Sequence, residues 1–267
     1  MTANTGGGRS GKDVNTVLAS IHTFDATAGC DAITFQPCSD RALINLLTYV
    51  NAFRDIYAIN SGIAANQSLA TGRYPEDVYF NGNVSFLFGV HVTILISMPQ
   101  PWYLATLAVA EQLYDAIIVW KLQKSLTITT ISQPFFAVFS PGITTGTYSS
   151  STSTYTTLVS AIQNYADGFV AVVAKYTPTG GGLNEQYSRD NGSPLSAVDL
   201  TWNYAALLTA SDARQGTMPA SWGASGLAVP TTCHGASGTS VAVTFNVNAN
   251  TIYGGMFHQR KDLLQPH

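Results

Sequence analysis

The sequence predicts an all-α fold, and three observations support this prediction. Residues 41–59 place apolar side chains three and four positions apart, which indicates one buried stripe along a helix. Residues 102–122 and 154–175 are further long segments without Pro, and Ala and Leu dominate the first of them. Alternating strand patterns are almost absent before residue 240. Several long helices with short connections are therefore expected.

In the first third of the chain we expect a helix over 13–20 and then a loop between Cys30 and Cys38. The helix over 41–59 follows, and Ser39 is placed to cap its first turn. Cys30 and Cys38 are close enough in sequence to close a small disulfide loop.

In the middle of the chain the helix over 102–122 carries Glu111 and Asp115, for which we expect a structural role. A shorter helix over 130–139 and the long one over 154–175 come next. The tract 148–157, rich in Ser, Thr and Tyr, has the composition of a linker.

Residues 182–204, GLNEQYSRDNGSPLSAVDLTWNY, place one carboxylate, Glu185, among aromatic side chains just before a helix start. Ser196 or Asp199 is expected to cap that helix over 200–208. Aromatic faces stack on sugar rings and carboxylates accept protons from sugar hydroxyls or water, so Glu185 is a candidate catalytic base. Taken alone, the same triplet also fits an ordinary solvated loop.

A second stretch, residues 72–83 (GRYPEDVYFNGN), concentrates sugar-binding side chains in one loop. Together with SGKD at 10–13, SIHTFD at 20–25, AEQLYDA at 110–116 and LSAVDLTW at 195–202, it closely resembles fungal glucoamylases of glycoside hydrolase family 15. The resemblance runs in order from about Ala3 to about Cys233. It implies a partial (α/α)6 toroid of the six-hairpin glycosidase type, with a short β-strand remnant near the C-terminus.

The resemblance also implies an activity and assigns roles to residues. The family's enzymes are inverting exo-hydrolases that release glucose from the non-reducing ends of starch and maltooligosaccharides, with one carboxylic acid and one opposed base. Glu185 matches the base. The remaining matches bind or line the sugar pocket: Arg73, Asp77, Tyr79, Trp102 and Trp202. The general acid lies in a Glu-Glu-Val-Asn segment that these 267 residues do not contain.

The domain organisation expected from this resemblance has four parts. Residues 1–219 correspond to the C-terminal part of the catalytic domain, and 220–239 to a linker rich in Gly, Ser, Ala and Pro. Residues 240–254 resemble the truncated start of a starch-binding domain, with a strand pattern at 241–247. Residues 255–267 form a tail that resembles neither. The resemblance also implies the Cys30–Cys38 disulfide, and it leaves Cys233 as an expected free thiol.

Residues 84–100 interrupt the family pattern, because Asn-Gly-Asn there runs directly into Pro-Trp-Tyr-Leu. Val84-Ser85 can be encoded by GTGAGT, a splice donor, and Gln100 by CAG, an acceptor. We hypothesise a retained intron, which sequencing of the mature transcript would test; a genuine apolar insertion is the alternative. The insertion is expected to separate Trp102 from the pocket that Arg73 and Asp77 help to form.

Composition and motifs exclude other classes. A net charge of −3 with 10% charged residues leaves no basic footprint for nucleic acid. The five His residues lack metal-ligand spacing, and Gly6–Lys12 imitates a phosphate loop but has Asp13 where Ser or Thr would be needed. We expect no metal, no cofactor and a monomer. The apolar insertion is too short to span a membrane. The first residues lack a signal-peptide pattern, although the family is secreted.

Three functions therefore compete. The first is a glucan 1,4-α-glucosidase with Glu185 as its base, in which the 267 residues alone give little or no hydrolysis because the acid is missing. The second is a non-catalytic binder of starch or oligosaccharides. The third is a product without a biochemical role, because half a toroid would expose apolar helix faces.

Overall fold

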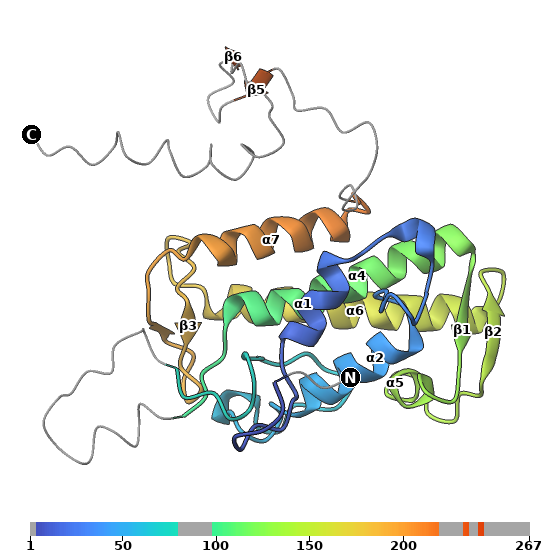
Figure 1. The fold of residues 1–267 in the computed structure, drawn as a ribbon, viewed down its shortest axis with the longest axis horizontal. Helices are drawn as coiled ribbons and strands as arrows, with labels where there is room; N and C mark the ends of the chain where they lie inside the picture. Colours follow the sequence, from blue (N-terminus) through green and yellow to red (C-terminus); the bar gives the residue numbers. More distant parts are fainter. Residues whose placement is uncertain (1–3, 80–97, 219–231, 235–239, 243–267) are drawn as a thin grey trace, which may run out of the picture. The chain divides into compact units, whose positions relative to one another are not determined.

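The computed structural model describes residues 4–79, 98–218, 232–234 and 240–242. The chain divides into two compact units, Met1–Trp222 and Gly223–His267. The described part of the first unit is mostly helical, as the sequence predicts (Figure 1). No helix in the described ranges combines the length and apolar character needed to cross a bilayer.

The core of the first unit is α4 (Tyr103–Gln123), whose residues from Tyr103 to Trp120 are all buried. Helix-forming Ala and Leu residues run through it, and it ends where Lys124 takes a left-handed conformation with φ 53°. It packs against α6 (Ser153–Tyr176), α7 (Thr201–Arg214) and α1 (Asn15–His22) (Figure 1). The predicted helix over 102–122 is confirmed to within one residue at each end.

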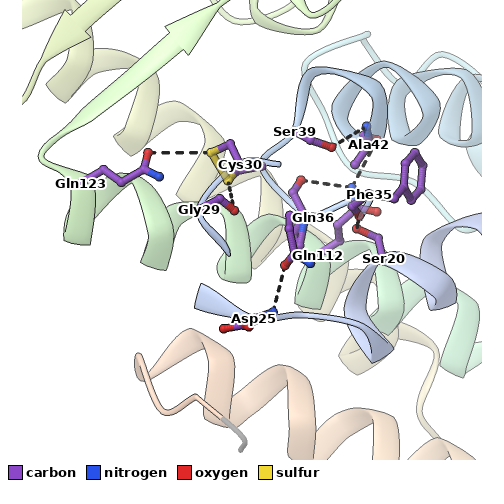
Figure 2. Close-up of a disulfide and its surroundings, with 12 residues drawn as sticks. Ser20, Asp25, Gly29, Cys30, Phe35, Gln36, Ser39, Ala42, Gln112 and Gln123 are labelled. Carbon is purple, nitrogen blue, oxygen red and sulfur yellow. Dashed lines mark hydrogen bonds between the residues drawn. A yellow bond between two sulfur atoms is a disulfide. The ribbon is translucent and has the colours of Figure 1, made fainter. Parts of the chain in front are cut away.

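The helix over 41–59 is confirmed at its start and wrong at its end. Ser39 accepts a hydrogen bond from the backbone N–H of Ala42, as a cap should, and α2 covers Asp40–Asn51 (Figure 2). The chain then turns into a short 3₁₀ helix, η2 (Ala58–Asn60). The reason is Asn60, whose buried amide donates to the carbonyls of Phe53 and Ala70 and thereby folds the segment back.

The Cys30–Cys38 disulfide is present, with the two Cα atoms 4.9 Å apart. It closes the loop after η1 (Ala26–Ala28). Gln36 lies in that loop and accepts a hydrogen bond from the N–H of Asp25, which precedes η1 (Figure 2). The segment between α1 and α2 is therefore held by one covalent bond and by polar contacts.

Short elements complete the two units. The predicted helix over 130–139 is reduced to α5 (Gln133–Ala137), and an unpredicted antiparallel pair, β1 (Ser125–Ile128) with β2 (Gly146–Ser149), flanks it. The tract after Tyr148 leads into α6, whose first turn Thr152 caps. In the second unit β5 (Thr232–His234) pairs with β6 (Ser240–Ala242). Residues 243–247 of the expected strand, the tail and most of the insertion lie outside the described residues.

Candidate active site

The loop over residues 72–79 is held from several sides before it presents any side chain. Gly72 has no room for a larger residue, because a Cβ there would lie 2.3 Å from the hydroxyl oxygen of Tyr57 and 2.7 Å from the carbonyl oxygen of Gln100. The Tyr49 hydroxyl donates to the carbonyl of Gly72 at 2.5 Å, and the N–H of Val14 donates to the carbonyl of Arg73 at 2.7 Å. The loop backbone is therefore fixed by the core.

Arg73 and Asp77 form a bidentate ion pair, with N–O distances of 2.7 and 2.6 Å. The side chain of Asp77 is 1% exposed, whereas that of Arg73 remains 30% exposed. Burial acts to lower the pKa of Arg73, but the hydrogen bonds and charge of Asp77 outweigh it and raise that pKa. Paired in this way, Arg73 keeps a fixed orientation and still offers donors to a ligand.

Two aromatic rings pack against the same guanidinium. Its central carbon lies 4.6 Å from the ring centre of Tyr79 and 4.7 Å from that of Trp102, and the two ring centres are 5.6 Å apart. Trp102 is held there by a backbone hydrogen bond to Thr71. The expectation that the 84–100 insertion separates Trp102 from this pocket is therefore wrong. Thr71, which precedes the insertion in the sequence, holds Trp102 at the pocket through this hydrogen bond.

Glu185 lies at the edge of this cluster with both carboxylate oxygens engaged. Its Oε1 accepts a hydrogen bond from the hydroxyl of Tyr79 at 3.3 Å, and its Oε2 accepts one from the hydroxyl of Ser196. The side chain is largely but not fully buried, with 8% of its area exposed. Burial raises the pKa of Tyr79 and the nearby charge of Glu185 adds to the rise, so Tyr79 stays a hydrogen-bond donor at neutral pH.

A small hairpin positions Glu185 and Ser196 opposite each other. The strands β3 (Gln186–Tyr187) and β4 (Pro194–Leu195) pair antiparallel, and the N–H of Glu185 donates to the carbonyl of Ala197 at 2.7 Å. Tyr187 anchors the hairpin: it is fully buried, stacks on Tyr176 with ring centres 5.2 Å apart, and its hydroxyl lies 3.1 Å from that of Thr106.

The expected capping of α7 by Ser196 or Asp199 is wrong. The N-cap position is Leu200, without a side-chain cap, and its N–H donates instead to the carbonyl of Leu183. Ser196 is occupied by Glu185, and Asp199 accepts a hydrogen bond from the hydroxyl of Tyr204 at 2.6 Å. Both residues take left-handed conformations, with φ of 67° and 53°. The sequence offered no signal that Ser196 would serve Glu185.

Trp202 is not brought together with the others. It lies in the first turn of α7, 51% exposed, and its ring lines a shallow pocket with Glu111 and His22. Among the described residues it makes no ring contact with Arg73, Tyr79 or Trp102.

The N-terminal segment supports the loop over residues 72–79, which the sequence did not indicate. Arg9 stacks on Tyr74, 3.5 Å from its ring centre, and pairs with the buried carboxylate of Asp13 at 2.6 Å. The N–H of Ser10 donates to Glu76 at 3.1 Å. Asp77 orients Arg73, and Glu76 ties the loop to the N-terminal segment. Residues 6–12, whose sequence resembles a phosphate-binding loop, thus have a structural role.

The described residues contain no group of three or more His, Cys, Asp or Glu side chains placed to hold a metal ion. The polar groups of the cluster are the Arg73–Asp77 ion pair, one tyrosine, one serine and the carboxylate of Glu185. Such a set can bind hydroxyl groups and accept a proton.

Residues 1–212 match the model of the glycosyl hydrolases family 15. The chain belongs to this family. It is 57% identical to "Glucoamylase-1" of Schizophyllum commune over 95% of this chain and 42% of that protein, and 51% identical to a Neurospora crassa glucoamylase over 90% and 36%. The fold matches that of the family 15 glucoamylase from Hypocrea jecorina with a TM-score of 0.75, at 51% identity over 91% of this chain and 38% of that one. The family-15 chain thus spans well under half the length of these relatives, and its fold is the corresponding part of the α/α toroid.

Proposed function

We propose that this chain supplies the base-carrying part of a glucan 1,4-α-glucosidase that releases glucose from starch and maltooligosaccharides. Glu185 is the general base, and it primes a water molecule for attack on the anomeric carbon. The single observation that supports this role is that Glu185 faces the Arg73–Tyr79–Trp102 cluster while Tyr79 and Ser196 orient its two oxygens.

The cluster beside Glu185 suits the terminal sugar of a chain. Arg73, which Asp77 holds in place, offers charged donors to sugar hydroxyls, and Tyr79 and Trp102 offer aromatic faces. Trp202, which matches the family pattern, lies apart from this cluster in the first turn of α7. An inverting enzyme holds its two carboxyl groups about 6.5–9.5 Å apart to admit a water molecule. The acid of this pair comes from the part of the toroid outside these residues, because they contain no Glu-Glu-Val-Asn segment.

The domain arrangement, the cellular location and the assembly state belong to the same proposal. Residues 1–219 serve as the catalytic portion, 220–239 as a linker and 240–254 as the start of a starch-binding module, followed by the unrelated tail. Residues 84–100 derive from a retained intron. The enzyme acts outside the cell as a monomer, as the resemblance to secreted glucoamylases implies.

The test combines the 267-residue chain with a hybrid in which residues 1–218 replace the matching part of the Schizophyllum commune glucoamylase. Glucose release from maltose is measured for both. We expect activity in the hybrid, and a loss of about 10²–10⁴-fold in kcat for Glu185→Gln, because loss of a general base removes about that much. Glu76→Gln is the matched control and should keep most activity. Equal rates for Glu185→Gln and the unmodified hybrid would refute the role of Glu185.

A second function, sugar binding without hydrolysis, is favoured by the ion pair and rings, which need no acid to hold a ligand. For the 267-residue chain, acarbose should raise the melting temperature by mass action. A shift in this chain together with an inactive hybrid would identify a binder, and no shift at all would favour a product without a biochemical role.

A further inference from the structure

The side chain of Asn203, in the first turn of α7, is fully buried and connects two segments of the candidate active site. Its Oδ1 accepts a hydrogen bond from the N–H of Leu104 at 3.1 Å. Its Nδ2 donates to the carbonyl of Asn184 at 2.5 Å, and that of Leu183 lies within reach at 3.5 Å. One amide therefore joins the start of α4 to the residue directly before Glu185.

On the side of α4, Asn203 takes the place of a missing helix cap. The first N–H groups of a helix have no partner within it, and Trp102, the N-cap residue of α4, makes no side-chain cap hydrogen bond. Asn203 supplies an acceptor from α7 instead. The turn that it caps begins directly after Trp102, whose ring packs against Arg73.

On the side of the hairpin, α7 holds the backbone that leads to Glu185. The N–H of Leu183 donates to the hydroxyl of Tyr204 at 3.0 Å. Asn203 reaches one residue further along the chain, to the carbonyl of Asn184. The contact with Asn203 therefore lies next to the residue that carries the base.

Asn203 supplies what both sides require. The N–H of Leu104 needs an acceptor and the carbonyl of Asn184 needs a donor, which sets the orientation of the amide. An ionised carboxylate has acceptors alone, whereas a protonated carboxyl has one acceptor and one O–H donor. Because Asn203 is 0% exposed, water does not replace a lost partner.

We propose that Asn203 is a positioning residue, which sets the place of Glu185 relative to Trp102 through this single amide. It acts through its two neighbours and not on the sugar. The inference rests on the proposed function, in which Glu185 is the base. A misplacement of about 1 Å costs roughly 100-fold in rate, so loss of the amide should lower kcat more than it changes KM.

The first experiment measures glucose release from maltose by the hybrid between about pH 4 and 9, with each variant compared with the unmodified hybrid at the same pH. Asn203→Leu should lower kcat by roughly 100-fold at every pH. Asn203→Asp should fall as far at high pH but recover to within about tenfold at low pH, where an O–H replaces the amide donor. Asn45→Asp is the matched control: Asn45 is also buried but donates to Thr16 on α1, and its ratio should not vary with pH.

The second experiment follows hydrogen exchange of the 267-residue chain by peptide mass, which needs no hydrolysis. Asn203→Leu should speed exchange roughly tenfold in the peptides that cover 103–106 and 183–187 together, because each loses a hydrogen bond. Asn45→Leu should speed exchange in neither.

Unchanged kcat in Asn203→Leu would overturn the proposal, as would an Asn203→Asp ratio that does not rise as pH falls, or faster exchange in one of the two segments alone. If Asn203→Leu does not fold, the pH dependence of Asn203→Asp decides. An inactive unmodified hybrid would refute the proposed function instead, and the exchange measurement would still decide whether Asn203 joins the two segments.

Discussion

Two carboxylate sites in the same helical unit differ in their hydrogen-bond partners. Glu185 lies on a hairpin, is 8% exposed, and its two oxygens accept hydrogen bonds from the hydroxyls of Tyr79 and Ser196. Glu111 and Asp115 lie one helical turn apart on α4 and are 9% and 2% exposed; Glu111 accepts one side-chain hydrogen bond, from Thr209. All three belong to segments that resemble the same family.

The difference concerns which protonation state each site stabilises. Burial raises the pKa of Glu111, and burial together with the charge of Glu111 raises the pKa of Asp115 well above its usual range. These two groups favour the neutral form and suit a structural role. Glu185 instead has two hydroxyl donors and lies beside the arginine–aromatic cluster. A carboxylate's partners therefore say more about its role than its motif does.

The largest effect that would sharpen this comparison concerns Arg73. Arg73→Lys replaces the fork that meets Asp77 with a point charge and should lower kcat/KM of the hybrid by roughly 100-fold, since misplaced binding groups cost about that much. Arg214→Lys, in the exposed pair with Asp167, is the control and should change little. Steady-state kinetics on maltose measure both, and equal values would show that the cluster does not hold the substrate.

Ser196 should give a smaller effect. Ser196→Ala leaves Glu185 with Tyr79 as its partner, and the loss of one charge-assisted hydrogen bond of about 1.5–3 kcal/mol corresponds to a fall in kcat of roughly ten- to hundredfold. Ser211→Ala, on the exposed face of α7, is the matched control. If both variants keep full kcat, Ser196 does not orient the base.

The smallest effect concerns the buried pair, and it has the opposite sign. Because the folded-state pKa of Asp115 is raised, the folded chain holds a proton that the unfolded chain releases, so stability falls as pH rises from about 4 through the folded pKa. Asp115→Asn removes the ionisable group, and with it this fall in stability at higher pH. We expect a melting temperature about 2–4 °C higher at pH 7 and little change near pH 4, since about 1 kcal/mol corresponds to that shift. If Asp115→Asn were less stable than the unmodified chain at pH 7, the burial of Asp115 would not disfavour its charged form.

The sequence predicted the helices whose pattern is long and periodic, and it missed what depends on side-chain competition. The start of α2 followed from Ser39. Its end depends on Asn60, whose side-chain amide donates hydrogen bonds to the carbonyls of Phe53 and Ala70. The same limit applies to the site: Glu185, Arg73 and Asp77 stand in recognisable motifs. Ser196 had the character of a helix cap and instead bonds to Glu185 across a hairpin that is only two residues long on each side.

The most direct test of Glu185 as the base is chemical rescue with azide. The hybrid carrying Glu185→Ala is given α-glucosyl fluoride, whose leaving group needs little help from an acid, and azide is added to fill the space left by the carboxylate. Attack from the base side forms a C–N bond as the C–F bond breaks, so the predicted result is restored turnover with β-glucosyl azide as the product. Undiminished hydrolysis without azide, or no rescue with it, would contradict the assignment.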